Sequence, residues 1–430
     1  MHKRIIQSSF FLLADRGFRL VISFVLGVLI ARFYGPEEFG QLNYVLATAS
    51  VFGSLSSLGL DDIVPRDMAA LNQEGLSRDD IEKTAFILRL FGGVAAYILV
   101  LGLTFYESGA SRLFVIASLL ALYLPIQAGD VYEYRLRVED EFSKIALSRS
   151  LAAFLANVLK ALVLIVALPI SYIAMAMTSE FLLTTTFFKL CLKKKGFLPG
   201  SFRSEYAKSL LLRSWKIIFA GLLITFQARV EYFLIEQFLG WQEVGQYSAA
   251  LKIFEIIDVV CVILVTVLMP KLAAMINSEN DMVYRRRTYL IGFSIYCLLI
   301  PVMIVLTIIF PYLYGTQYAE AAAVLPWLFL RPLFGMLGSV RNMFIVLEGN
   351  YWYPALSALC SLIVSVITGY SLIPEYGLYG AIASSMLGLF TLTVLTDLAF
   401  YRKNSFAVFT CFYEFFYFKR LIMQGRRGSL

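Results

Sequence analysis

Histidine and paired cysteines are almost absent from this chain of 430 residues. It contains one histidine, His2, and five cysteines, none of which lie in a C-x-x-C pair. We therefore expect neither a metal site nor a disulfide framework, because both need grouped Cys or His side chains. The sequence also has no G-x-x-x-x-G-K-[ST] loop and no nucleophile elbow. These absences exclude the common NTPase and hydrolase signatures, and we expect no catalytic residues and no bound cofactor.

Charged residues are scarce as well. They make up 16% of the chain, which is 59% hydrophobic and has a mean hydropathy of +0.75, whereas soluble domains are nearer 45–50% apolar and about 25% charged. Apolar runs of about 20 residues, each long enough to cross about 30 Å of hydrocarbon, recur along the chain. Since lipid tolerates only helices or closed barrels and the runs show no alternation, we predict an all-α polytopic membrane protein. Its twelve transmembrane helices are expected near 9–33, 39–60, 84–106, 112–135, 145–168, 170–190, 213–238, 244–270, 288–310, 318–347, 352–373 and 377–401.

A stretch near the start of the chain recurs 205 positions later without a gap. Residues 30–74 align with residues 235–279, and the matches include glycines, acids and a proline. Shared hydrophobicity does not constrain such positions, and the period is too long for a solenoid repeat. We therefore predict two homologous halves of six helices, related by an axis along the membrane normal. The matched pairs include Gly35 with Gly240, Glu38 with Glu243, Gly40 with Gly245, Gln41 with Gln246 and Pro65 with Pro270.

The repeat and the predicted spans divide the chain into four parts. We expect an N-terminal lobe at 1–195, a cytoplasmic loop at 196–208, a C-terminal lobe at 209–403 and a cytoplasmic tail at 404–430. The tail contains an apolar, aromatic segment that is short, includes Glu414 and has basic residues at both ends. These features favour a helix that lies in the membrane interface over a thirteenth span.

Lysine and arginine are distributed unevenly between the loops. The predicted outer loops at 35–38, 311–317 and 374–376 have none, and the loop at 107–112 has only Arg112. Because cytoplasmic loops carry the excess of basic residues, both termini are expected to be cytoplasmic. The net charge of +7 is then a signal of orientation in a plasma membrane, and we expect no nucleic-acid partner.

Several cations lie inside the predicted spans, where each costs about 2.5–3.5 kcal/mol on insertion scales and tends to face a cavity or a partner. Their surplus predicts a water-filled cavity with positive walls. Such a cavity suits an anionic head group, phosphate above all, because Arg binds phosphate as a fork and Lys as a point charge. Snorkelling or a structural ion pair is the alternative for each of them. The candidate substrate-binding residues are Arg16, Arg19, Arg89, Lys160, Arg229, Lys252, Arg331 and Arg341.

Acids inside the predicted spans have two interpretations. They pair with the cations, or they bind a coupling proton or sodium ion, as intramembrane carboxylates do in transporters. Residues four apart on a helix share a face, so Asp15 can pair with Arg19, and pairing is favoured for Glu255 with Lys252. The candidates are Asp15, Glu180, Glu231, Glu255, Asp258 and Asp397.

The segments ARFYGPEEFGQLNYVLA at 31–47 and GLDDIVPRDMA at 59–69 resemble the polysaccharide-unit and O-antigen flippase family. That family belongs to the multidrug, oligosaccharidyl-lipid and polysaccharide exporter superfamily. The resemblance implies two six-helix lobes around a V-shaped cavity with cationic walls, and export of isoprenoid-diphosphate-linked sugar units across the bacterial plasma membrane. Arg16, Arg19 and Arg229 fit the cavity by their positions in the first and seventh spans.

Three functions follow from these observations. The favoured one is a flippase for a lipid-linked oligosaccharide of O-antigen, capsule or exopolysaccharide, with membrane lipids and a polysaccharide polymerase and its chain-length machinery as partners. A cation-coupled multidrug antiporter of the same superfamily is the alternative, although the surplus of span cations argues against it. A membrane sugar polymerase or ligase is disfavoured because every predicted outer loop is short.

Overall fold

Helices account for all the regular structure in the part of the chain that the structure describes. The computed structural model describes residues 2–70, 76–192, 200–254, 257, 281–350 and 352–410, with the side chains of residues 2–21 and of residue 281 outside the description. No strand occurs among these residues, so the predicted all-α fold class is confirmed. The elements are α1 His2–Ser57, α2 Ile63–Ala70, α3 Arg78–Ser108, α4 Arg112–Leu120, α5 Tyr123–Ile126, η1 Gln127–Asp130, α6 Val131–Val138, α7 Phe142–Ile165, α8 Ile170–Cys191, α9 Ser204–Gln227, α10 Val230–Leu239, α12 Asp281–Tyr314, η2 Thr316–Tyr318, α13 Ala319–Val324, η3 Leu325–Phe329, α14 Leu330–Leu347, α15 Tyr353–Phe390, η4 Thr391–Leu395 and α16 Thr396–Phe400. Residues 241–254 and 402–410 are helical as well.

The predicted spans fall on these helices. The first two spans form α1, which breaks at Gly35, and the last two lie in α15, η4 and α16, with a break at Gly377. The span predicted at 244–270 is described as helix up to residue 254. Seven stretches of the described chain are long and apolar enough to cross a membrane. They are Arg78–Ser108, Arg112–Val138, Phe142–Ile165, Ser204–Gln227, Met282–Tyr314, Thr316–Leu347 and Tyr353–Phe400.

The outward faces of these helices are apolar. Phe91 on α3 is 71% exposed and Leu298 on α12 is 74% exposed. In the most apolar 18-residue stretch of α3, 22% of the residues are buried inside the protein, and in that of α12 17% are buried. Large apolar side chains on so much of the surface need an apolar solvent. The chain is therefore a multi-pass membrane protein.

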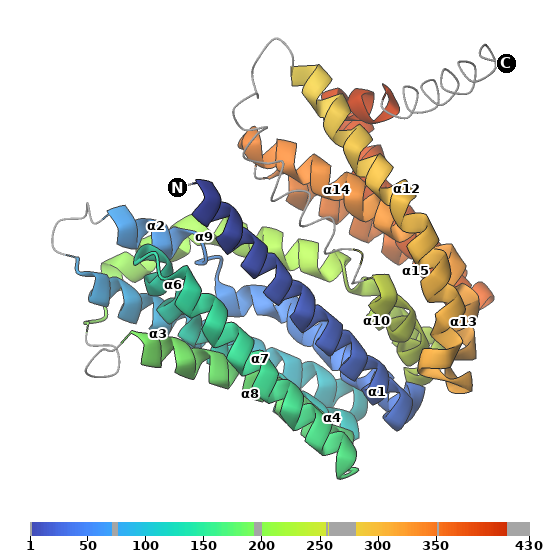
Figure 1. The fold of residues 1–430 in the computed structure, drawn as a ribbon, viewed down its shortest axis with the longest axis horizontal. Helices are drawn as coiled ribbons and strands as arrows, with labels where there is room; N and C mark the ends of the chain where they lie inside the picture. Colours follow the sequence, from blue (N-terminus) through green and yellow to red (C-terminus); the bar gives the residue numbers. More distant parts are fainter. Residues whose placement is uncertain are drawn as a thin grey trace. The chain divides into compact units, whose positions relative to one another are not determined.

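Contacts divide the chain into two compact units. The first contains Met1–Tyr232 and Trp241–Gly245, and the second contains Phe233–Gly240 and Gln246–Leu430. In the first unit α7 and α8 form an antiparallel pair and α1 lies along α3 (Figure 1). The helix α9, which belongs to the predicted C-terminal lobe, contacts α1 and α3 in this unit. The lobe boundaries at 195 and 209 stay predictions.

A buried apolar cluster holds the first unit together at one end of its helices. It joins residues of the turn after α1, of α2, α3, α6 and α9. In α9 the buried residues form a narrow stripe and the wider face is exposed, as expected for a helix packed on one side and facing lipid on the other. No residue of α6 is exposed. The cluster consists of Leu60, Val64, Met68, Ile81, Ala85, Val131, Tyr134, Tyr206 and Leu210.

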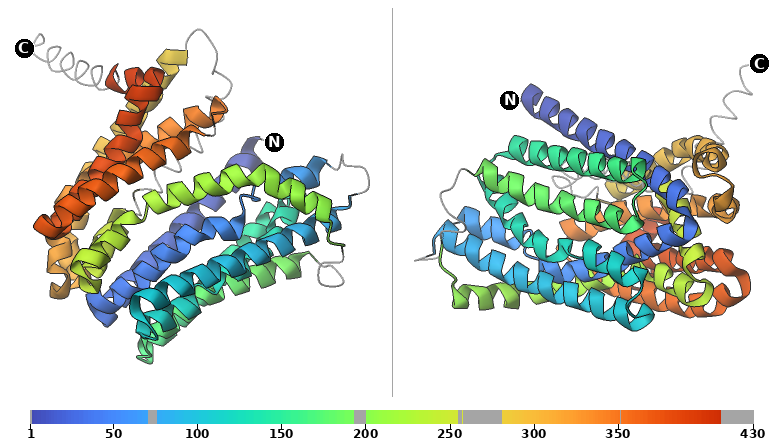
Figure 2. Two further views of the ribbon diagram at one scale, coloured as in Figure 1. Left: turned by 180° about the vertical axis from the view of Figure 1, so that it is seen from behind. Right: turned by 90° about the horizontal axis from the view of Figure 1, so that it is seen from below.

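In the second unit α12, α14 and α15 pack together, and Figure 2 shows the last described helix against α12. The buried cluster there joins Tyr289 of α12, Met336 and Phe344 of α14, and Ala407 and Val408 of the helix at 402–410. The beginning of the predicted tail is therefore part of the core of this unit. The remainder of the aromatic segment predicted at the membrane interface lies outside the described residues.

The turns of the two halves correspond. Five turns in the described first half contain a residue with positive φ. Four of them have a counterpart in the second half 205, 206, 209 or 210 positions later, and the fifth, at Leu58 and Gly59, falls opposite residues outside the description. Left-handed backbone recurs at such intervals only if the helices between the turns have nearly the same lengths, as the sequence repeat predicts. The pairs are Gly35 (φ 77) with Gly240 (φ 93), Gly109 (φ 61) with Gly315 (φ 84), Asp140 (φ 56) with Gly349 (φ 73), and Ala167 (φ 57) with Gly377 (φ 56).

The repeated glycines also contact each other's segments. A Cβ atom on Gly40 would lie 2.8 Å from the backbone N of Gly245, and one on Gly245 would lie 2.9 Å from Cα of Pro36. The ring of Tyr44 packs edge-on against Trp241, with centroids 5.0 Å apart. Glycine is required at both positions because backbone meets backbone there.

Candidate functional site

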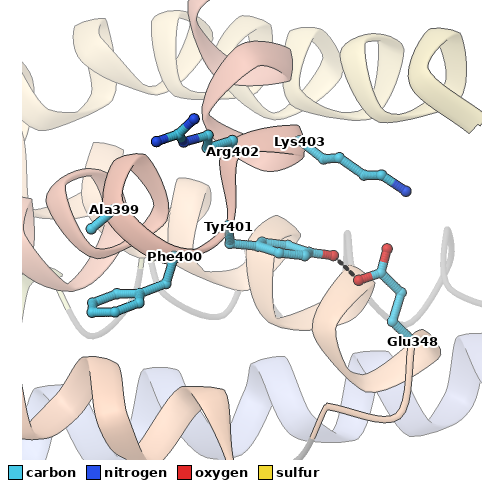
Figure 3. Close-up of a pocket in the computed structure, with 6 residues that line it drawn as sticks. All are labelled: Glu348, Ala399, Phe400, Tyr401, Arg402 and Lys403. Carbon is cyan, nitrogen blue, oxygen red and sulfur yellow. Dashed lines mark hydrogen bonds between the residues drawn. The ribbon is translucent and has the colours of Figure 1, made fainter.

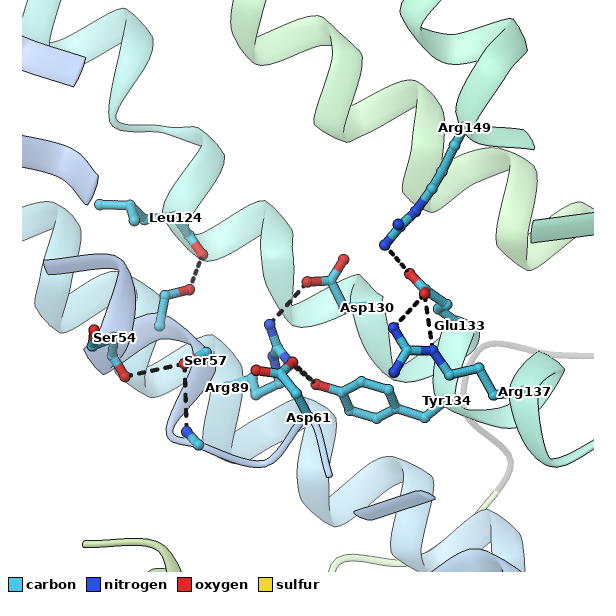
Figure 4. A network of polar contacts seen from close by, with 12 residues as sticks. Ser54, Ser57, Asp61, Arg89, Leu124, Asp130, Glu133, Tyr134, Arg137 and Arg149 are labelled. Carbon is cyan, nitrogen blue, oxygen red and sulfur yellow. Dashed lines mark hydrogen bonds and ion pairs between the residues drawn. The ribbon is translucent and has the colours of Figure 1, made fainter. Parts of the chain in front are cut away.

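Arg89, on α3, lies in a buried polar network (Figure 4). Its side chain is 1% exposed; Nη1 lies 2.9 Å from Oδ1 of Asp61, and Nη2 lies 2.9 Å from Oδ2 of Asp130. The hydroxyl of Tyr134 donates to the same oxygen of Asp61 at 2.5 Å and accepts a hydrogen bond from Arg89. Two carboxylates thus surround one guanidinium, and only loss of both would leave its buried charge without a counter-charge. This arrangement fits the structural ion pair that the sequence analysis leaves open for Arg89.

Glu133, on α6, binds two arginines beside that network (Figure 4). Its side chain is 4% exposed; Oε1 lies 2.7 Å from Nη2 of Arg137, and Oε2 lies 2.6 Å from Nη2 of Arg149 on α7. Neither Asp130 nor Glu133 is among the candidate residues predicted from the sequence. Both lie inside the predicted span at 112–135, and acids inside a span are the signal that would have identified them.

Lys160 and Glu180 join α7 to α8. Lys160 is 7% exposed, and its Nζ lies 3.5 Å from Oε2 of Glu180 and 3.2 Å from Oδ1 of Asn157. A buried ammonium needs such partners to keep its charge. The Glu180 side chain is more accessible, with 38% exposed. The structure therefore brings together a predicted substrate-binding cation and a predicted coupling acid.

Arg341 and Asp397 form a second buried ion pair, in the other unit. Nε of Arg341 lies 2.7 Å from Oδ1 of Asp397, and the two side chains are 5% and 1% exposed. Arg341 also donates to Oγ of Ser357 at 2.5 Å. Asp397 accepts hydrogen bonds from the hydroxyl of Tyr353 at 2.7 Å and from Nδ2 of Asn404 at 2.9 Å. The network ties α14, α15 and α16 to the helix at 402–410, and so much pairing favours a structural role.

The remaining described candidate cations, Arg229, Lys252 and Arg331, are half-buried. Nη1 of Arg331 on α14 donates to Oγ of Ser385 on α15 at 3.2 Å, and Lys252 lies in the helical stretch at 241–254. Arg229 precedes α10, and its guanidinium carbon lies 5.8 Å from the ring centroid of Tyr232. Arg229 forms no ion pair with a described residue. Among the predicted cations it is therefore distinct from the acid-bound Arg89, Lys160 and Arg341.

The acid nearest Arg229 in the sequence does not neutralise it. Glu231 on α10 is 3% exposed and forms no ion pair with a described residue. Positions two apart on a helix point to different sides, which explains why the two charges do not meet. Several other candidates are not tested by these contacts: the side chains of Asp15, Arg16 and Arg19 lie outside the described part of the chain, as do Glu255 and Asp258.

These contacts sort the candidate residues by what they can offer a ligand. An arginine or lysine already bound to carboxylates must break a pair to bind an anion, which is costly for a buried charge. Arg229 has no ion pair with a described residue to break, so it can attract an anion without that cost. It also sits between α9 and α10, where two turn residues interrupt the helix. The set of candidate site residues stays a prediction, and Arg229 is its best supported described member.

The chain matches the model of one protein family over more than half its length. That family is described as polysaccharide biosynthesis protein, and the match covers residues 5–276. No curated protein matches the chain.

Solved structures share the fold over nearly the whole chain. A multidrug resistance MATE family transporter in an inward-facing conformation is 17% identical, with a TM-score of 0.73 over 91% of this chain and 95% of its own. The lipid II flippase MurJ in an inward closed conformation is 15% identical, with a TM-score of 0.68 over 95% and 92%. A MOP superfamily transporter from Pyrococcus furiosus is 17% identical, with a TM-score of 0.61 over 92% and 96%. The fold of all three agrees with two lobes of six helices, and the chain belongs to the polysaccharide biosynthesis protein family, with the fold of MOP superfamily transporters.

Proposed function

We propose that this protein is a flippase that moves isoprenoid-diphosphate-linked oligosaccharide units across the bacterial plasma membrane. The observation that carries the proposal is membership of the polysaccharide biosynthesis protein family, through residues 5–276. Sugar units built on a lipid carrier inside the cell must cross the membrane before they join a surface polysaccharide. The similarity to the lipid II flippase MurJ supports this assignment, since it shows that the same fold serves a lipid-linked substrate.

In the proposed mechanism the polar head group of the substrate lies in water and its isoprenoid tail lies in lipid. The diphosphate and sugars occupy a wet cavity lined by span cations, and the isoprenoid tail stays in lipid. Arg229 binds the diphosphate by charge-assisted hydrogen bonds, which are roughly twice as strong as neutral ones. Arg16 and Arg19 of α1 have the same proposed role. The lobes then rock so that the cavity opens to the other side, and no covalent bond is made or broken.

The carboxylates in the spans are proposed to couple the movement to an ion gradient. Glu180 is the most accessible of the described candidates, with 38% of its side chain exposed, and it faces Lys160 at 3.5 Å. A proton or sodium ion bound by Glu180 would compete with the lysine for the carboxylate and so weaken the link between α7 and α8. Asp397 is 1% exposed and fully engaged with Arg341, so it is less suited to exchange an ion.

The surroundings of the protein follow from its charge distribution. We place both termini in the cytoplasm, because the loops on that side carry nearly all the lysines and arginines. The partners are the lipid-linked oligosaccharide, membrane lipids, and the polymerase and chain-length machinery that use the exported units.

The proposal is tested with Arg229→Ala in cells that lack the chromosomal copy. Loss of a charged hydrogen-bond partner costs about 1.5–3 kcal/mol, so we expect export to fall about ten- to hundred-fold, with lipid-linked units accumulating on the inner leaflet. Arg66→Ala is the matched control, because Arg66 is exposed in α2 and is not among the proposed site residues. Normal surface polysaccharide with Arg229→Ala at wild-type protein levels would remove Arg229 from the site. Normal polysaccharide in the deletion strain itself would refute the flippase function.

A multidrug antiporter is the second candidate function, since the MATE family transporter is similar over 91% of this chain. That function predicts that the deletion strain becomes more sensitive to lipophilic cationic dyes while its surface polysaccharide is unchanged. The flippase predicts the reverse. A cavity with excess cations repels cationic drugs, which is why the flippase is preferred.

A further inference from the structure

The end of α16 borders a cavity that the proposed transport cycle does not use. Its volume is about 620 Å³, and it opens where the last described span gives way to the helix at 402–410 (Figure 3). Figure 3 shows the ring of Tyr401 pointing toward Glu348, with the side chains of Arg402 and Lys403 extending in opposite directions beside it. The lining residues are Glu348, Ala399, Phe400, Tyr401, Arg402 and Lys403.

The acid in this cavity is already neutralised. Glu348 forms an ion pair with Arg285, whose side chain is fully buried, and accepts a hydrogen bond from the hydroxyl of Tyr401. Burial, and then the hydrogen bond to Glu348, raises the pKa of the Tyr401 hydroxyl, so Tyr401 stays a donor at physiological pH. Arg402 and Lys403 are exposed and form no ion pair with a described residue. The cavity therefore presents two cations that no described acid offsets.

The surface next to the cavity is apolar. The helix at 402–410 is anchored by Ala407 and Val408, which belong to the buried cluster of α12 and α14. Its opposite side exposes Phe406 and Phe409, which are 57% and 52% exposed. A helix with one face in the protein and an aromatic outer face beside basic residues is suited to the boundary between acyl chains and head groups. An anion that enters this cavity thus meets cations and hydrocarbon at the same place.

We propose that this cavity binds the phosphate-bearing head group of an anionic phospholipid from the leaflet at that end of the spans. Arg402 and Lys403 attract the head group by their positive charge, and the exposed phenylalanines contact its acyl chains. Basic pockets at the ends of membrane helices bind such head groups by attraction at close range. A free phosphate ion would use the two cations but would gain nothing from the apolar surface, so the lipid is the favoured source of the phosphate.

The proposal is tested on the purified full-length protein in detergent. Phosphatidylglycerol or phosphatidylcholine is titrated in, and native mass spectrometry counts the bound lipids. Each cation near an anionic head group contributes about five-fold in affinity, so Arg402→Gln combined with Lys403→Gln should weaken phosphatidylglycerol binding on the order of twenty-fold. Binding of phosphatidylcholine, which has no net charge, should change little.

Two further variants test whether binding is specific to Arg402 and Lys403. They distinguish a specific site from attraction by any surface cation and from misfolding of the variant. Arg66→Gln with Lys208→Gln removes two exposed cations of the other unit, and phosphatidylglycerol binding should remain at the wild-type level. Arg402→Lys with Lys403→Arg keeps both charges and should keep the affinity. Equal losses in the Arg66 and Lys208 control, or an unchanged affinity without Arg402 and Lys403, would overturn the proposal. If an equal concentration of inorganic phosphate displaces phosphatidylglycerol, the site binds the free ion instead. If farnesyl diphosphate binds more tightly than phosphatidylglycerol and displaces it, the site binds the transported lipid.

Discussion

Replacement of Gly40 or Gly245 by alanine tests how the two copies of the repeat meet. A Cβ on Gly245 would lie 2.6 Å from the carbonyl carbon and 2.9 Å from Cα of Pro36, and a Cβ on Gly40 would lie 2.8 Å from N of Gly245. These neighbours are backbone atoms, which cannot rotate aside as a side chain would. Either substitution must therefore move one helix away from the other.

The size of the effect follows from two opposing terms. Overpacking costs about 1–3 kcal/mol. Because the added Cβ would meet backbone atoms of the facing segment, the cost at these two positions should be near the upper end of that range. Removal of a helical glycine returns about 0.5–1 kcal/mol through lower entropy of the unfolded chain. We expect a net loss of about 2 kcal/mol for each variant. At about 2–4 °C per kcal/mol, the midpoint of thermal unfolding should fall by about 4–8 °C.

The assay is thermal unfolding of the purified variants in detergent, followed by intrinsic fluorescence. Gly53→Ala is the matched control, because Gly53 lies in the same helix, α1, and its added Cβ would meet nothing within 4 Å. That variant should be as stable as the wild type or more so. The double variant Gly40→Ala with Gly245→Ala should lose less than the sum of the single losses, since the first substitution already separates the helices. If Gly40→Ala were as stable as Gly53→Ala, the close backbone contact would not exist.

Three further predictions concern stability and use the same assay. Asp397→Ala should lower the free energy of unfolding by about 3–5 kcal/mol, because it leaves the guanidinium of Arg341 buried without its carboxylate; a loss below 1 kcal/mol would mean that Arg341 reaches water. Gly240→Ala should lower the free energy of unfolding by about 1–3 kcal/mol because of backbone strain at its φ of 93. An added Cβ would meet nothing within 4 Å, so crowding does not contribute. An unchanged unfolding midpoint would contradict the left-handed turn. Glu38→Gln should change the free energy of unfolding by less than about 1 kcal/mol, because its partner Arg112 is 62% exposed. A larger loss would show that this ion pair stabilises the turn after Gly35.

The span pattern could be read from the sequence because the bilayer imposes it. Each apolar run predicted a helix, and the described helices coincide with those runs, including the break at Gly35 between the first two. The repeat predicted the recurrence of turns, since glycines and prolines mark turn positions directly. The interfacial helix of the tail stays a prediction. The helix at 402–410 packs Ala407 and Val408 against α12 and α14, and no local pattern in the sequence marks these two residues for such packing.

The candidate site was predictable only as a set of residue types. The cost of charge in lipid points to every intramembrane cation, and Arg89, Lys160, Arg229 and Arg341 were all identified on that ground. Which of them are neutralised depends on acids far away in the sequence. Arg341, for example, meets Asp397 across 56 positions.

The amino-acid sequence by itself determined that this protein spans a membrane, how its helices repeat and which loops carry the positive charge, because these properties depend on composition and on local order along the chain. The tertiary structure alone decided which charges cancel. It buried Arg89 between two carboxylates, left Arg229 without an acid among its described neighbours and gathered Arg402 and Lys403 beside a neutralised Glu348. Pairing of charges is a matter of distances between helices, and those distances are set by the packing of side chains that are remote from one another in the sequence.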